Sequence, residues 1–200
     1  MSSDLKNKTF TYLEYLESGG IIEQSYELVA GEIVETPPEK FGNINIALQL
    51  ILLLAQHIEI ERITHQAEII ISGSKVTARI PDITVFSENG IAQIAQLDRL
   101  IIDLDMLPPL LVVEIVSPGK VNHDRDYRYK RCEYAARGIP HYWIVDPMLQ
   151  KFTCLWLVDG MYEETVYENQ GETIRLGEPI ELEIDLKQIF GVAQTWDDLD

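Results

Sequence analysis

The stretch Leu-Leu-Val-Val-Glu-Ile-Val at residues 110–116 decides how the chain folds. It is a continuous apolar run with one carboxylate, Glu114, and it lies between Pro108-Pro109 and Ser117-Pro118-Gly119. A short run of branched apolar residues between turn-forming residues is typical of a strand buried on both faces of a sheet. Because an isolated buried carboxylate is costly, Glu114 requires protonation, hydrogen bonds or a cation beside it.

The segment after this strand predicts a strand–helix–strand unit. Residues 124–137 have the apolar spacing of a helix, which Gly138-Ile139-Pro140 ends. Residues 141–146, His-Tyr-Trp-Ile-Val-Asp, form the next strand before Pro147. Two strands joined by a helix are parallel neighbours with a right-handed crossover. The helix is therefore expected to lie next to Glu114.

One lysine of this helix faces the interior in the predicted arrangement. At about 100° per residue, Lys130 falls on the same stripe as Tyr127 and Tyr134, which are expected to contact the protein. Lys130 either points toward Glu114 or lies along Tyr134 with its ammonium in solvent. Arg131, at a similar angle on the other side, has the same two possibilities.

The remaining elements predict an α/β protein with one mixed central sheet, flanking helices and additional antiparallel hairpins, in a single domain over residues 1–200. In the strand at 79–86, Pro81 indicates a bulge or an edge, and Asp82 shares a face with Thr84. The other predicted elements are a short helix at 9–16, a hairpin at 26–29 and 32–35, a helix at 42–63, two antiparallel strands within 67–86 around Gly73-Ser74-Lys75, a connection at 87–106, a hairpin at 151–158 and 161–168, a strand at 180–184 and a helical turn at 186–190.

The composition indicates where in the cell the protein is expected to be. The 200 residues are 46% apolar but contain no apolar span near the ~20 residues that a membrane helix needs. The first residues lack the apolar region of a signal peptide, so we expect a cytoplasmic protein with no membrane contact. Cys132 and Cys154 have no metal-ligand spacing and are expected to be free thiols.

The charge is unevenly distributed. The net charge of −17 argues, taken alone, against a nucleic-acid partner, and much of it comes from residues 159–200. Residues 120–137 are instead net basic, and they follow the Glu114 strand directly. This segment is either a solvated helix face or a surface that contacts DNA. Its candidate DNA contacts are Lys120, Arg125, Arg128 and Arg131.

Three residues carry the candidate chemistry. Asp82 and Glu114, on adjacent strands, are suited to hold a hard divalent cation such as Mg²⁺ through oxygen ligands and water. An ammonium beside them would orient a water molecule and offset the charge that develops during phosphodiester hydrolysis. Val116 stands on the same face as Glu114, where a lysine would be ideal. Lys130 is the nearest substitute.

Several segments together resemble a known bacterial family. Pro81-Asp82 followed by Glu114-Ile115-Val116 resembles the P-D…(D/E)-x-K signature of the restriction-endonuclease-like superfamily, with the lysine position vacant. More specifically, the chain is similar to the Uma-type restriction endonuclease family once called domain of unknown function 820. The segments that carry this resemblance are Tyr26–Glu32, Pro81-Asp82, Val113–Pro118, Asp126–Lys130, Tyr134–Pro140 and Tyr142–Pro147.

The resemblance implies a restriction-endonuclease-like core and roles for individual residues. It implies that Asp82 and Glu114 bind Mg²⁺ or Mn²⁺, with the Ile115 carbonyl as a third ligand, and that Lys130 is a displaced catalytic lysine. Glu27 matches an early acidic residue that assists the metal or its water, or else only caps a hairpin. Two positions depart from the family pattern: His141 replaces a common acid and Phe41 replaces a common histidine. The resemblance also implies a homodimer, which the aromatic residues of the last hairpin would permit.

We therefore expect a Mg²⁺-dependent DNA endonuclease. The leading alternative is an inactive nuclease-fold protein that binds a partner, and retention of Asp82, Glu114 and Lys130 counts against it. A third hypothesis is a hydrolase that uses Ser117 as its nucleophile. The sequence does not show a histidine and an acid arranged around Ser117, so a role in a turn or a helix cap is the simpler interpretation of this serine.

Overall fold

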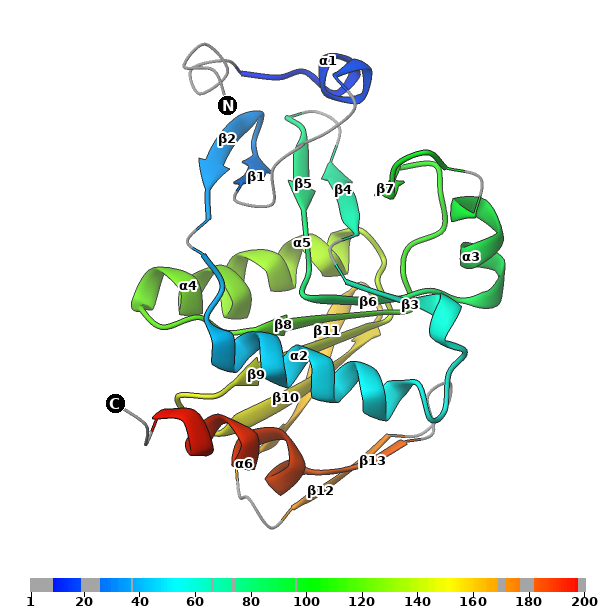
Figure 1. Ribbon diagram of the computed structural model, residues 1–200. Coiled ribbons are helices and arrows are strands. Elements are labelled where there is room, and N and C mark those ends of the chain that lie inside the picture. The colour runs from blue at the N-terminus through cyan, green and yellow to red at the C-terminus, as the bar shows by residue number, and fades with distance from the viewer. Residues whose placement is uncertain are drawn as a thin grey trace.

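A six-stranded mixed sheet forms the centre of the protein, seen in a computed structural model that describes residues 9–18, 26–36, 38–65, 67–72, 75–95, 97–168, 172–176 and 182–197. The strand order is β11-β10-β9-β8-β6-β3 (Figure 1). The β8 and β9 strands are parallel and the other neighbours are antiparallel, which confirms the predicted strand–helix–strand unit. The strands are β3 (Ile63–Thr64), β6 (Ile83–Val85), β8 (Leu111–Ile115), β9 (His141–Asp146), β10 (Lys151–Val158) and β11 (Met161–Tyr167).

A second, five-stranded sheet stands beside the first, in the order β2-β1-β5-β4-β7 (Figure 1). The sequence predicted the hairpin that forms β1 and β2 and the two strands that form β4 and β5, whereas β7 lies in the segment 87–106 that was expected to be a connection. Its predicted hairpin β1–β2 is confirmed, with Ala30 and Gly31 at positive φ in the turn. Gly73 and Ser74, the expected turn between β4 and β5, lie outside the described residues. The strands are β1 (Tyr26–Val29), β2 (Glu32–Glu35), β4 (Glu68–Ser72), β5 (Thr77–Arg79) and β7 (Ile101–Ile102).

The chain crosses from the second sheet to the first at Pro81. The prediction of one strand over residues 79–86 is wrong, because β5 ends at Arg79 and β6 begins at Ile83. Proline has no backbone N–H to donate to a sheet ladder, so it favours a break of this kind. As a consequence Asp82 lies at the junction of the two sheets instead of inside a strand that it shares with Thr84.

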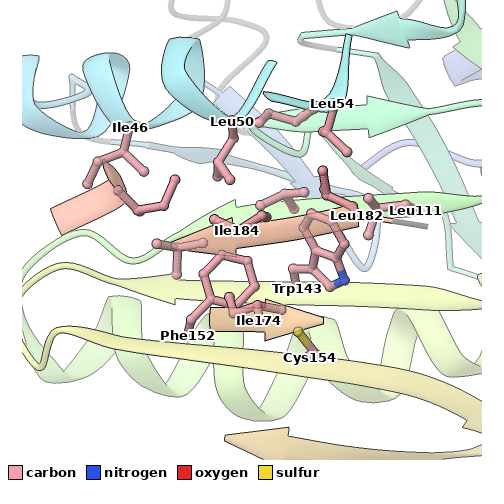
Figure 2. Close-up of a cluster of buried hydrophobic side chains, with 14 of the residues drawn as sticks. Ile46, Leu50, Leu54, Leu111, Trp143, Phe152, Cys154, Ile174, Leu182 and Ile184 are labelled. Carbon is pink, nitrogen blue, oxygen red and sulfur yellow. The ribbon is translucent and has the colours of Figure 1, made fainter. Parts of the chain in front are cut away.

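One face of the six-stranded sheet is covered by α2 (Phe41–Leu54) and α6 (Leu186–Asp197), which lie side by side (Figure 1). Beside them the antiparallel pair β12 (Thr173–Leu176) and β13 (Leu182–Asp185) closes the core. The α2 helix is shorter than predicted, because the chain turns after Leu54 and then forms the 3₁₀ turn η1 (Ile60–Arg62) and β3. The core side chains labelled in Figure 2 are Ile46, Leu50, Leu54, Leu111, Trp143, Phe152, Cys154, Ile174, Leu182 and Ile184.

The other face of this sheet is covered by one continuous helix in three parts. They are α4 (Lys120–Asp124), the π-helical segment η2 (Arg125–Lys130) and α5 (Arg131–Ala136). The helix thus begins earlier than predicted, at Lys120, and it stops before Gly138, which has φ +77° as expected of a helix-ending glycine. Two short helices complete the fold, α1 (Tyr12–Glu17) and α3 (Glu88–Ile94).

Two further expectations concern the chain as a whole. Cys132 and Cys154 are free thiols, the first exposed and the second buried. Within the part of the chain that the structure describes, no helix has the length and apolar character to span a membrane.

Candidate active site

A pocket of about 490 Å³ brings together all four predicted catalytic residues. Glu27 comes from β1, Asp82 from the junction between the sheets, Glu114 from β8 and Lys130 from the end of η2. The α2 helix forms one wall of the pocket. The two sheets and the helix between β8 and β9 therefore each contribute to one site.

Asp82 and Glu114 are neighbours across two antiparallel strands. Ile83 of β6 pairs with Val113 of β8, so the residues next to them in the chain also lie opposite each other. The Oδ2 atom of Asp82 accepts a hydrogen bond from the Ile115 backbone N–H at 2.6 Å. Burial and the nearby Glu114 carboxylate raise the pKa of Asp82 well above its usual range. Two carboxylates so close cannot both be charged without a cation.

Lys130 is buried and lies among three carboxylates. Its Nζ is 2.8 Å from Oε1 of Glu114, 3.2 Å from Oε1 of Glu27 and 3.8 Å from Oδ1 of Asp126. The side chain is only 2% exposed, so an ammonium in solvent is excluded. Burial alone would lower the pKa of Lys130, but Glu114 and Glu27 outweigh burial and raise it, so the ammonium stays charged.

The pKa of Glu114 is raised to about 7. Burial is the largest cause, and Asp126 and Glu27 add to it, while the Lys130 ammonium opposes the shift. The buried Tyr134 hydroxyl donates to Glu114 Oε1 at 2.6 Å, so this oxygen receives hydrogen bonds from both Tyr134 and Lys130. No hydrogen bond to the other oxygen, Oε2, is found within the described residues.

Arg79 connects Glu27 to the helix. Its Nη1 is 2.8 Å from Glu27 Oε2, and its Nε and Nη2 bind the Glu133 carboxylate at 2.7 and 2.8 Å. Burial opposes ionisation of Glu27, but Lys130 and Arg79 together lower its pKa to about 2. Glu27 therefore stays ionised and reaches into the site, which a hairpin-capping role alone does not explain.

The sequence interpretation missed Arg79, Tyr134 and Asp126. Asp126 is fully buried; its Oδ1 accepts from Arg125 Nε at 3.1 Å, and within the described residues its Oδ2 has no hydrogen-bond partner. Asp126 lies four residues before Lys130, a spacing that places both on one face of the helix. The helical spacing placed Tyr134 on the inward face but did not indicate its contact with Glu114, and Arg79 lies in no pattern that would have identified it.

Asn43 of α2 links Ile115 and Ser117 at the edge of the pocket. Its Nδ2 donates to Glu39 Oε1 at 2.5 Å and to Ser117 Oγ at 3.2 Å, and it is 3.5 Å from the Ile115 carbonyl oxygen. No histidine forms a hydrogen bond with Ser117 in the described part of the chain. The serine has the contacts of a linking residue, not those of an activated nucleophile.

The four candidate DNA contacts separate into two groups. Lys120 and Arg128 are exposed on the helix, and Arg125 is half-buried and lines the pocket. Arg131 instead binds the Glu164 carboxylate and donates to the Tyr162 carbonyl oxygen at 3.0 Å, both on β11. The two positions that depart from the family pattern do not line the pocket: Phe41 is the exposed first residue of α2, and His141 begins β9.

Comparison with known proteins identifies related sequences and folds. The model of the Uma2 family, described as "Putative restriction endonuclease", matches residues 14–187. A crystal structure from Anabaena variabilis ATCC 29413, described as a "putative nuclease belonging to DUF820", superposes with a TM-score of 0.70. The two chains are 16% identical, and the match covers 92% of this chain and 99% of that chain, so this likeness shows the fold alone. Curated protein sequences gave no match.

Replacing Arg79 tests the buried ionic network. The Arg79→Met variant keeps the aliphatic stem but leaves Glu27 and Glu133 without their guanidinium partner. Because breaking a buried pair leaves an uncompensated charge, we expect the free energy of unfolding in urea to fall by about 3–5 kcal/mol. Arg128→Met is the matched control, since Arg128 is exposed and 3.9 Å from Asp124; it should change stability by less than about 1 kcal/mol. Equal effects of the two variants would contradict this account.

Proposed function

The chain belongs to the Uma2 family, and on this premise we propose that it is a metal-dependent endonuclease that hydrolyses phosphodiester bonds of DNA. The observation that carries the proposal is the contact between the buried Lys130 ammonium and Glu114, in a pocket that Asp82 also lines. Two adjacent carboxylates can hold a metal cation, and a lysine beside them supplies a positive charge for the reacting phosphate.

Asp82 and Glu114 fit a divalent cation. Burial raises the pKa of each, and the Glu114 carboxylate raises that of Asp82 further. A cation between Asp82 and Glu114 would offset both the burial and this repulsion. Among the described residues no three histidine, cysteine or acidic side chains converge as a metal cluster. The ion would therefore rest on two carboxylates, the Ile115 carbonyl oxygen and water. Mg²⁺ suits such a set because it retains several waters, and Mn²⁺ would occupy the same ligands.

Lys130 performs the step that this chain itself contributes. When bound, Mg²⁺ supplies Lewis-acid polarisation of the phosphate and a lower pKa for water. The Lys130 ammonium orients the attacking water and offsets negative charge that grows on the phosphate oxygens. Because Lys130 comes from η2, it replaces the lysine that is missing at Val116.

Glu27, Arg79 and Tyr134 are positioning residues. Glu27 contacts the Lys130 ammonium in addition to Glu114, and Arg79 holds Glu27. Tyr134 binds Glu114 Oε1, which leaves Oε2 for the cation. Since all these contacts exist without substrate, little reorganisation is needed when the phosphate arrives.

DNA would approach over the basic segment beside the pocket. Lys120 and Arg128 are exposed there, and Arg125 lies at the pocket itself. Arg125 already contacts Asp126, and Arg131 contacts Glu164. The net charge of −17 opposes a polyanion elsewhere on the surface. Binding should therefore be weak and should depend strongly on salt concentration.

Cleavage of supercoiled plasmid at low salt with Mg²⁺ or Mn²⁺ tests the function. We expect the wild-type protein to nick the plasmid, and Glu114→Gln and Lys130→Ala each to reduce the rate at least about 100-fold, as loss of a transition-state contact does. Lys187→Ala, at an exposed lysine of α6, should retain the wild-type rate. No nicking by folded protein with either metal would contradict the proposal and favour a binding role.

The raised pKa of Glu114 predicts how metal affinity depends on pH. Below about 7 the carboxyl carries a proton that the cation must displace, so Mn²⁺ should bind more tightly as pH rises from 6 to 8. We expect a change of about tenfold per pH unit below 7, measured by titration calorimetry. Glu163→Gln, at an exposed acid of β11, should leave this dependence unchanged. An affinity that is constant over this range would contradict the assignment of Glu114 as a ligand.

A further inference from the structure

The pocket that contains the candidate catalytic residues also has an apolar wall. The residues of this wall, which we call the apolar wall, are Ile44, Ala47, Leu48, Ile51, Ile80 and Pro81. The first four belong to α2, at positions i, i+3, i+4 and i+7, which form one face of a helix. The last two lie where the chain crosses between the two sheets. The proposed hydrolysis of a phosphodiester does not itself use this surface.

The apolar wall borders the candidate metal ligands. Pro81 directly precedes Asp82 in the chain. Ile44 directly follows Asn43, whose Nδ2 is 3.5 Å from the Ile115 carbonyl oxygen. A group that binds against the wall would therefore lie next to the phosphate that the charged residues hold.

The apolar wall is accessible and carries no charge. Ile44 and Leu48 are 43% and 53% exposed, and α2 has no acidic or basic residue along its length. The pocket volume of about 490 Å³ falls within the ~300–1,000 Å³ of sites that bind small organic molecules. Exposed apolar side chains that gather in such a pocket are typical of a ligand-binding surface. The wall thus suits an uncharged group of the substrate.

We propose that the apolar wall binds an unpaired nucleobase next to the scissile phosphate, and that the preferred substrate is therefore single-stranded DNA. This inference rests on the proposed endonuclease function and names its substrate class. The base is the flat, uncharged part of a nucleotide, and every base has a π face that packs on apolar side chains. One nucleotide would then match both parts of the pocket, its base on the wall and its phosphate beside Lys130.

Charge favours a single strand over a duplex. The net charge of −17 opposes any polyanion, and a duplex brings about twice as many phosphates to the protein as one strand does. Contact with a base adds affinity that does not require a basic surface. In a duplex the same base would first have to be unpaired and unstacked, which costs free energy. The single strand therefore gains the contact with the wall at a lower cost.

Cleavage of a labelled oligonucleotide, alone or annealed to its complement, tests the substrate class. With Mn²⁺ at low salt, kcat/KM should be at least about tenfold higher for the single strand, because its bases are already unpaired. An abasic site should lower cleavage at the adjacent phosphate about tenfold and should have no effect at distant phosphates. Equal cleavage of the two forms, or abasic sites without effect at any position, would overturn the proposal. An equal abasic penalty in the duplex would indicate a flipped-out base and would overturn the preference for a single strand.

The Leu48→Ala variant tests the role of the wall. It should lower kcat/KM for the single strand about fivefold and remove most of the abasic penalty, because the base loses the contact that the penalty measures. Leu52→Ala is the matched control and should cleave as wild type, since Leu52 is 63% exposed on the same helix but does not line the pocket. If circular dichroism shows Leu48→Ala to be misfolded, Ile44→Ala replaces it. An unchanged abasic penalty in the folded wall variant would contradict the proposal.

A binding measurement separates this inference from the proposed function. Fluorescence anisotropy with Ca²⁺, which also takes oxygen ligands but in a looser geometry than Mg²⁺, compares the affinity for the same two forms of the oligonucleotide. The single strand should bind at least about tenfold more tightly than the duplex, and Leu48→Ala should reduce this difference. This preference without cleavage under any metal would refute the endonuclease but retain the base site. Cleavage by wild-type protein without the preference would refute only the base site.

Discussion

The buried ammonium of Lys130 is the interaction on which the rest of the structure depends. A charged amine that is removed from water must be compensated, and here Glu114, Glu27 and Asp126 provide the compensation. These carboxylates come from the central sheet, from the second sheet and from the helix itself. The two sheets and the helix must therefore be correctly assembled before the lysine is satisfied. Arg79 adds a second link between the second sheet and the helix by joining Glu27 to Glu133.

The same arrangement explains why the site is poised for chemistry. Ion pairing lowers the pKa of Glu27, whereas burial and neighbouring carboxylates raise the pKa values of Asp82 and Glu114. The pair with raised pKa values lies on adjacent strands, where a cation would relieve its repulsion. Perturbed carboxylates in a pocket beside a charged lysine are the usual mark of a functional site.

The sequence predicted the residues whose local pattern is unusual. Glu114 interrupts an apolar strand, Asp82 follows a strand-breaking proline, and Lys130 stands on an inward helix face, so each could be found without the fold. Arg79 and Tyr134 could not, because their contacts join residues far apart in the chain. Asp126 lies four residues before Lys130 on the same helix face, and it was missed because only the aromatic residues of that face were considered. The division into two sheets was missed because the strand pattern does not indicate which strands pair across Pro81.

The most direct test of the central claim is anomalous diffraction from crystals soaked in Mn²⁺ above neutral pH. Asp82 and Glu114 are proposed to share one cation beside Lys130, and the account predicts an anomalous peak within bonding distance of both carboxylates and of the Ile115 carbonyl oxygen. The same soak of Glu114→Gln crystals should lack the peak. A peak elsewhere, or no peak in wild-type crystals at saturating Mn²⁺, would contradict the claim that these residues form a metal-dependent nuclease site.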